Sequence, residues 1–132
     1  MSNVTIKGAS SLQSEIDEIL TASEAEIRIA SYEASKKTAK EIVKVLKSSS
    51  PKRKGGYSKG WKATAEEDGY VVHNGRYPGL THLLENGHDL VVNGAKVGRV
   101  SGEPHIKPAE NLGIQMFELE VKDEIERRLG NG

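Results

Sequence analysis

The sequence predicts an α+β fold: a long N-terminal helix and a C-terminal helix packed on a small antiparallel β-sheet, with a short helix and a glycine-rich hairpin arm. Two observations lead to this prediction. From Ala9 to Ser50 there is no glycine or proline, and apolar residues recur at helical spacing. Residues 61–106 instead alternate short apolar segments with turn dipeptides, which is typical of hairpins. All 132 residues are expected to form one domain.

The first half of the chain is expected to be almost entirely helical. A short strand is predicted over residues 1–8, because "VTIKG" alternates apolar and polar residues. One helix is predicted over residues 10–47, with acidic early turns and basic last turns that suit the helix dipole. Small residues fill the middle of its apolar stripe, so its packing partner must approach closely. Pro51 follows the helix and opens a basic linker predicted over residues 48–60.

A β-rich region with a short helix is predicted over residues 61–106. Trp61 opens an alternating pattern that turns at Asp68-Gly69 and forms the first hairpin. The short helix is expected from about Leu80 to Asn86, with the glycine that follows it in a left-handed C′ position.

The last third of the chain is predicted to hold an arm and a helix. Asn93 and Gly94 stand between two valine-bearing segments, which indicates a hairpin within an arm over residues 88–104. A C-terminal helix is predicted over residues 107–130, with a proline near its start and an apolar stripe along it. His105, just before this helix, is expected to shape its beginning.

Composition excludes several classes of protein. Hydrophobic residues make up 36 % of the chain and aromatics 5 %, which is little for a compact monomer and indicates that a partner covers part of the apolar surface. Cysteine is absent, which excludes disulfides and thiolate metal sites. The first ten residues lack the apolar core of a signal peptide, and no apolar run approaches the roughly 20 residues that span a bilayer. A soluble, intracellular protein is therefore expected.

The formal net charge of zero conceals strong segregation of charge. Residues 1–34 hold six acids and two bases, residues 35–62 ten bases and one acid, and residues 63–132 twelve acids and seven bases, giving −4, +9 and −5. Oppositely charged patches on identical molecules attract one another, so this pattern favours contact between copies. The alternative, that these are simply solvated faces, stays open at this stage.

The most basic stretch is "PKRKGGYSKGWK", residues 51–62, which contains no acidic residue. Gly55 and Gly60 have the spacing of a phosphate-binding loop, but Trp61 stands where the lysine belongs and no helix follows. The hypothesis of a phosphate-binding loop is therefore rejected. Basic residues interleaved with Tyr57 and Trp61 could instead hold a nucleic-acid backbone and stack on a base.

Motifs for catalysis or metal binding are weak. In "HLLENGH", His82, Glu85 and His88 do not have the spacing that places metal ligands on one helix face, and capping or interface hydrogen bonds suit them better. No serine occurs in a nucleophile elbow, and Glu66 and Glu67 lie beside a turn where solvated carboxylates are usual. We expect no enzymatic activity, no metal and no cofactor.

The order of these segments resembles that of a known family. "VTIKG" leads into the long helix, "SPKRKGGYSKGWKA" precedes a hairpin, and "YPGLTHLLENGH", a glycine-rich loop and "PHIKPAEN" follow. The chain resembles, over nearly its whole length, the tail-completion or head–tail joining proteins of long-tailed bacteriophages, also known as minor tail components. Pro51, Gly55 and Tyr57 match the family's "P-x-x-T-G-x-L" turn, whereas Lys54 replaces its threonine.

The resemblance implies a structural, non-enzymatic virion protein that forms a homo-oligomeric ring in the neck between the DNA-filled head and the tail. The implied partners are other copies and neck or tail proteins, namely head-closure, tail terminator or tail tube proteins, with passive contact to DNA in the lumen. No membrane and no small-molecule substrate are implied, and assembly would take place in the bacterial cytoplasm. The alternative is a small nucleic-acid-binding accessory protein that uses the basic segment.

These expectations define a predicted interface. The residues expected to dock on an acidic partner are Lys52, Arg53, Lys54, Lys59 and Lys62. Tyr57 and Trp61 are expected to anchor this segment as interface aromatics, and the Asn93-Gly94 hairpin is expected to reach a neighbour. His105 completes the set. The competing interpretation is that residues 51–60 are merely a solvated linker.

Overall fold

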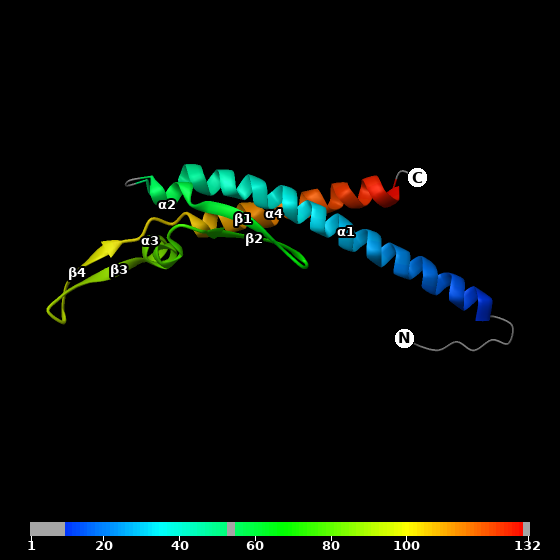
Figure 1. Ribbon diagram of the computed structural model, residues 1–132, viewed down its shortest axis with the longest axis horizontal. Helices are drawn as coiled ribbons and strands as arrows, with labels where there is room; N and C mark the ends of the chain where they lie inside the picture. The colour runs from blue at the N-terminus through cyan, green and yellow to red at the C-terminus, as the bar shows by residue number, and fades with distance from the viewer. Residues whose placement is uncertain (1–9, 53–54, 131–132) are drawn as a thin grey trace.

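The computed structural model describes residues 10–52 and 55–130, so the strand predicted over residues 1–8 lies outside the described part. The predicted α+β class is confirmed. Figure 1 shows an elongated molecule in which the long helix α1 (Ser10–Ser49) extends far beyond the other elements at one end. The β-rich part and the C-terminal helix gather around the second half of α1.

Helix α1 is a single helix of 40 residues, or about 60 Å at the standard rise per residue. The prediction of one unbroken helix is thus confirmed, with the end two residues beyond the expected residue 47. The Ser50 hydroxyl donates a hydrogen bond to the carbonyl of Leu46, and Pro51 follows. These two residues end the helix because one occupies a last-turn carbonyl and the other cannot continue the helical hydrogen bonding.

The C-terminal helix α4 (Ile106–Ile125) continues as a π-helical turn, η2 (Glu126–Gly130). Together they cover the helix predicted over residues 107–130, although the last turn is π-helical.

Helices α1 and α4 pack antiparallel and close together. Lys37 contacts Glu124, whereas Ile42, further along α1, lies against Gly113, nearer the start of α4. A Cβ placed on Gly113 would be 3.3 Å from Cγ1 of Ile42, and Ala34 is fully buried. Small residues therefore permit this approach, as predicted from the α1 sequence.

The region predicted over residues 61–106 contains two separate antiparallel hairpins. Strands β1 (Trp61–Glu66) and β2 (Gly69–Asn74) form the first two-stranded sheet, and β3 (Gly87–Val92) and β4 (Ala95–Ser101) form the second. The second pair of strands has a register irregularity between Leu90 and Val91. Figure 1 shows β1–β2 against the middle of the molecule and β3–β4 projecting at the end opposite the start of α1.

The prediction of a basic linker over residues 48–60 is wrong in part. Its first two residues belong to α1, and Gly56–Lys59 form the helical turn α2, in which Tyr57 and Ser58 are buried. Gly55 has a φ of 80°, a conformation that glycine adopts at little cost and that redirects the chain toward the core.

The predicted short helix is present as α3 (Thr81–Asn86), preceded by a 3₁₀ turn, η1 (Pro78–Leu80). Gly87 ends α3 with φ 79° and ψ 178°. This is an extended conformation reserved for glycine, not the left-handed helical one predicted, because the chain passes directly from α3 into strand β3.

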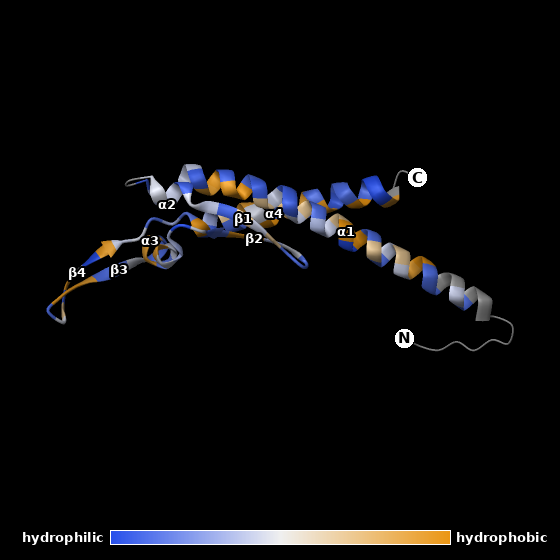
Figure 2. Ribbon diagram, viewed as in Figure 1, coloured by the Kyte–Doolittle hydropathy of each residue, from blue (hydrophilic) through white to orange (hydrophobic). Residues whose placement is uncertain are grey.

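The hydrophobic core is small and sits at one end of α1. Its buried members are Ile42, Leu46, Tyr57, Trp61 and Ala109. In Figure 2, apolar residues also occur along the first half of α1, where no other element covers them. Within the described residues, no helix is both long enough and apolar enough to cross a membrane.

Candidate assembly surfaces

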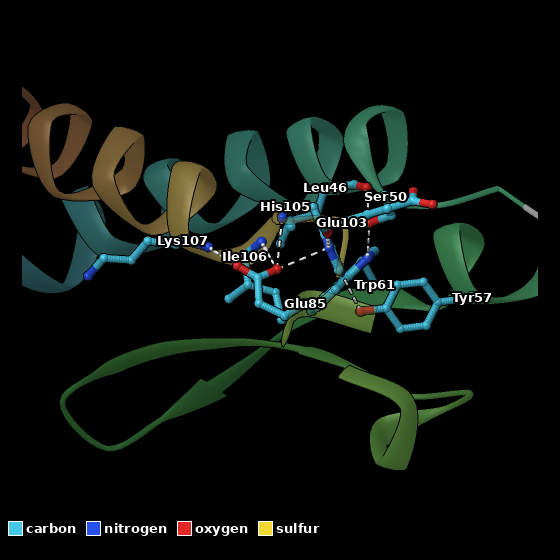
Figure 3. A network of polar contacts seen from close by, with 9 residues as sticks. All are labelled: Leu46, Ser50, Tyr57, Trp61, Glu85, Glu103, His105, Ile106 and Lys107. Atoms are coloured by element: carbon cyan, nitrogen blue, oxygen red, sulfur yellow. Dashed lines mark hydrogen bonds and ion pairs between the residues drawn. The ribbon is translucent and has the colours of Figure 1, made fainter. Parts of the chain in front are cut away.

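A buried polar network joins the end of α1, helix α2 and the start of α4 (Figure 3). The Tyr57 hydroxyl lies 2.7 Å from Nε2 of His105, and Nε1 of Trp61 donates to the Ser50 hydroxyl at 2.7 Å. Nδ1 of His105 lies 2.7 Å from the carbonyl oxygen of Glu103, which can only accept. A neutral imidazole therefore carries its proton on Nδ1, and Tyr57 donates to Nε2.

Glu85 connects α3 to the first turn of α4. Its carboxylate accepts hydrogen bonds from the backbone N–H groups of His105 at 2.7 Å, Ile106 at 2.8 Å and Lys107 at 2.9 Å. These donors have no partner within the helix, so a carboxylate from another element caps α4. Burial opposes ionisation, but the three N–H groups and the His105 ring outweigh it and lower the pKa of Glu85 below its usual value.

The same network affects Tyr57. Burial, with a smaller contribution from the Glu85 charge, raises the pKa of Tyr57 to about 12. The phenol therefore stays protonated as the donor that His105 requires.

Asn74, at the end of β2, fixes the position of α2. Its side-chain amide donates to the carbonyl of Tyr57 at 2.7 Å and accepts from the N–H groups of Arg76 and Tyr77 at 3.1 and 2.9 Å. It is 1 % exposed. A Cβ on Gly60 would lie 2.4 Å from the Asn74 side-chain oxygen, so only glycine fits there. No motif in the sequence around Asn74 indicates this role, because the groups that it binds belong partly to a distant segment.

The structure corrects the prediction that Tyr57 and Trp61 anchor a partner at the surface. They are 7 % and 4 % exposed and pack edge-to-face with ring centroids 5.6 Å apart. His105, also predicted at an interface, is 2 % exposed. All three residues serve the chain's own core because α2 turns the basic segment inward. His105 does lie directly before α4, as predicted.

The charged members of the predicted interface behave differently. Lys52, Lys59 and Lys62 are exposed, so this part of the segment presents positive charge to solvent. Arg53 and Lys54 lie outside the described residues.

The β3–β4 hairpin forms an exposed apolar arm. Asn93 and Gly94 both have positive φ, 49° and 80°, as the predicted two-residue turn requires. The apolar residues of the arm that are more than two-fifths exposed are Leu90, Val91, Val92 and Val97. An ion pair between Asp89 and Arg99, at 3.2 Å, holds the two strands near the base of the arm.

A pocket of about 430 Å³ lies where the arm meets the body. Its wall is mainly apolar, with Tyr77, Leu80 and Leu83 from the η1–α3 segment and Val100 from β4. Tyr77, Leu80 and Leu83 are each more than a third exposed, so this side of the molecule adds to the uncovered apolar surface.

Part of the charge segregation is used within the chain. Lys37 donates to the buried Glu124 carboxylate at 2.8 Å and also approaches Glu120 at 4.0 Å. The hydrogen bond from Lys37, together with Arg127 and Arg128, lowers the pKa of Glu124 although burial opposes this. The basic half of α1 thus meets acidic residues of α4, and only the remaining lysines are available to another molecule.

Among the described residues, no group of three or more histidine, cysteine, aspartate or glutamate side chains is arranged to hold a metal ion. Glu85, from the histidine-containing "HLLENGH" segment, is engaged in capping α4. Comparison with protein-family models, with curated proteins and with solved structures finds no match to this chain.

Proposed function

We propose that this protein is a structural subunit of a homo-oligomeric ring in the neck of a long-tailed bacteriophage, where it connects the DNA-filled head to the tail. The proposal combines the family resemblance of the sequence with one structural observation. Large apolar side chains are uncovered at both ends of an elongated molecule whose own core is small.

The two ends supply apolar surfaces built from different elements, one from a helix and the other from a hairpin. At the start of α1, Ile19 is 65 % exposed and Ile27 44 %, and at the opposite end Val91 is 62 % and Val97 63 % exposed. Burial of such side chains stabilises an assembly in proportion to the apolar area removed from water. Different patches at opposite ends favour heterologous contacts, which close into rings when the rotation between subunits permits.

In this role the neighbours are the adjacent subunits and the proteins above and below the ring, namely head-closure, tail terminator or tail tube proteins. Contact with DNA would be passive, through the lumen. The protein would be part of the virion and would assemble in the host bacterial cytoplasm.

The alternative, nucleic-acid binding through residues 51–62, is less well supported. Stacking on a base requires an accessible aromatic face. Tyr57 and Trp61 are both buried, which leaves that segment with exposed lysines and no stacking platform among its described residues. Lysines alone would give weak, sequence-independent binding.

Light scattering on the purified protein, alone and with candidate neck partners, tests the proposal. A ring component should give a multiple of the monomer mass and annular particles in negative stain, with negligible retardation of random DNA at moderate salt. A protein that stays monomeric even with neck partners yet retards DNA with a steep salt dependence would contradict it.

A further inference from the structure

The outward face of α1 carries a division of charge that the core does not use and that, among the described residues, the C-terminal segment α4–η2 contacts through an ion pair at Glu26. Residues at intervals of three or four lie on one face of a helix. From residue 18 to residue 47, one such line runs along the side of α1 opposite its buried residues, which include Ala34, Thr38 and Ile42. We refer to this line as the outer stripe of α1.

The first half of the outer stripe is acidic with small and apolar residues between. It contains Glu18, Ala22, Glu26, Ile29 and Glu33, all exposed or half-buried. Ile29 is 45 % exposed, and a shallow groove runs along Glu18 and Ala22. Only one of the three acids has an ion pair among the described residues, namely Glu26, which lies 3.5 Å from Arg128.

The second half of the outer stripe is basic throughout. It contains Lys36, Lys40, Lys44 and Lys47, spaced by four, four and three residues. Of these, only Lys44 forms an ion pair within the described residues, with Glu41 at 3.3 Å on the helix surface. Such an exposed pair contributes little. Lys40, Lys44 and Lys47 are exposed and Lys36 is half-buried, so this half presents positive charge to another molecule.

A groove beside this basic half provides an apolar floor. It has a volume of about 810 Å³, and Lys40, Lys44 and Lys47 line it together with Lys62 of β1. Glu41 and Glu120 also line it, but they are outnumbered by the lysines. Val43 and Met116 lie among its apolar lining residues. A ligand that fits this groove needs negative charges spaced along a rod and an apolar side chain between them.

We infer that the basic half of the outer stripe binds the acidic half of α1 from a second copy of this chain. The acidic half meets each requirement, because it is a helix that carries three carboxylates, with Ala22 and Ile29 between them. Its start overhangs the body, so another molecule can approach it (Figure 1). This inference rests on the proposed ring for its biological meaning, and it names the subunit contact within that ring.

Each copy offers both halves. Two antiparallel copies in full register would satisfy both contacts at once and close as a dimer, whereas copies offset along the helix repeat the contact from one copy to the next, as a ring requires. Attraction between exposed charges falls with ionic strength, since the Debye length shortens from about 10 Å at 0.1 M to about 3 Å at 1 M. Self-association of the full chain should therefore weaken as salt is added.

Charge reversal tests the contact in the full-length protein. The acidic-half variant is E18K/E26K/E33K and the basic-half variant is K36E/K40E/K47E. Each alone should weaken self-association at low salt by at least roughly tenfold in sedimentation velocity, because like charges then face each other. An equimolar mixture of the two variants, and a chain that carries all six changes, should recover self-association.

The control E67K/E118K/D123K changes the net charge as much as the acidic-half variant, but away from α1, and should assemble like the wild type.

The outcomes separate this inference from the proposed function. Circular dichroism first establishes that every variant keeps its helix. Wild-type assembly that persists in both half-variants, or a wild type that stays monomeric at low salt, overturns the inference. Retardation of DNA that K36E/K40E/K47E abolishes, without any self-association, also overturns it in favour of a nucleic-acid partner. If self-association recovers in the mixture but the particles are no larger than dimers, the contact is supported and the ring is contradicted. If rings form and none of the charge reversals affects them, the ring is supported and this contact is contradicted.

Discussion

At the scale of single residues, Glu85 determines how α3 meets the start of α4. One carboxylate holds three N–H groups at the start of α4 and lies 3.0 Å from Nδ1 of His105. His105 in turn orients Tyr57, and Tyr57 closes the core beside Trp61. A chain of polar contacts therefore connects α3, α4 and α2, which ordinary apolar packing would position less specifically.

Replacement of Glu85 by glutamine should make this contribution measurable. The E85Q variant loses the charge in hydrogen bonds that are charge-assisted, so we expect the free energy of unfolding at pH 7 to fall by about 1.5–3 kcal/mol. The folded-state pKa of Glu85 lies below the value of 4.5 expected when unfolded, so its stabilisation is complete above that value and is lost as pH falls through the folded pKa. Urea unfolding at pH 7 and at stepwise lower pH should show the difference in stability between the wild type and E85Q shrinking once the pH falls below 4.5.

A suitable control is E110Q, which removes an exposed carboxylate from the same end of α4. The Glu110 side chain is 57 % exposed, and its one ion pair within the described part of the chain is with Lys107 at the surface. Its loss should change stability by less than about 0.5 kcal/mol. If both variants lose the same free energy of unfolding, and the loss does not change with pH, the capping role of Glu85 is contradicted.

At the scale of elements, the arm depends on a tight junction between α3 and β4. Glycines at this junction let backbone approach backbone. A Cβ on Gly102 would lie 2.4 Å from the Glu85 carbonyl oxygen and 2.6 Å from the Asn86 carbonyl carbon. A Cβ on Gly87 would lie similarly close to the carbonyl oxygen of Val100. The direction of the arm is thus set by backbone contacts at its base.

Gly102→Ala should therefore disturb the arm. The methyl group would meet backbone atoms that cannot rotate away, so we expect a loss of about 1–3 kcal/mol and a change in the position of β3–β4. Gly79→Ala is the matched control, since no atom of the described residues, apart from Gly79 and its two chain neighbours, lies within 4 Å of its Cβ position. Urea unfolding gives the stability, and amide chemical shifts of residues 87–101 report the arm. Unchanged shifts and stability in the Gly102 variant would show that the junction is looser than described.

At the scale of the whole molecule, α1 serves two purposes along its length. Its second half contributes Ile42 and Leu46 to the core, whereas its first half leaves residues such as Ile19, Leu20 and Ile29 uncovered. An isolated helical segment is only marginally stable in water, so the first half gains most from a partner. Folding and assembly should thus depend on different isoleucines of one helix.

This separation is testable with one substitution at two sites. Ile42→Ala removes a side chain that is 7 % exposed and should cost about 2–5 kcal/mol in urea unfolding. Ile29→Ala removes one that is 45 % exposed, so it should change monomer stability by less than about 0.5 kcal/mol but weaken self-association in sedimentation velocity. If Ile29→Ala destabilises the monomer as much as Ile42→Ala, the first half of α1 is not a free surface.

Local patterns in the sequence were enough to predict most elements. The absence of glycine and proline over about forty residues permits one long helix, and apolar residues at helical spacing favour it. Asn93-Gly94 favours a two-residue turn. Both features depend on the backbone preferences of neighbouring residues. The small residues of α1 likewise indicated a close helix partner. Exposure of the predicted lysines also follows from their strong hydration.

Tertiary structure decided the parts that depend on distant residues. The residues next to Glu85 do not indicate that it caps a helix that begins twenty-one positions later. The residues next to Asn74 likewise do not indicate that it holds α2. For the same reason Tyr57 and Trp61 appeared as surface anchors, although Gly55 and α2 turn them into the core. Periodicity and turn chemistry act over a few residues, whereas burial depends on which surfaces the folded chain brings together, and the packing of α2 against α1 and α4 decided it here.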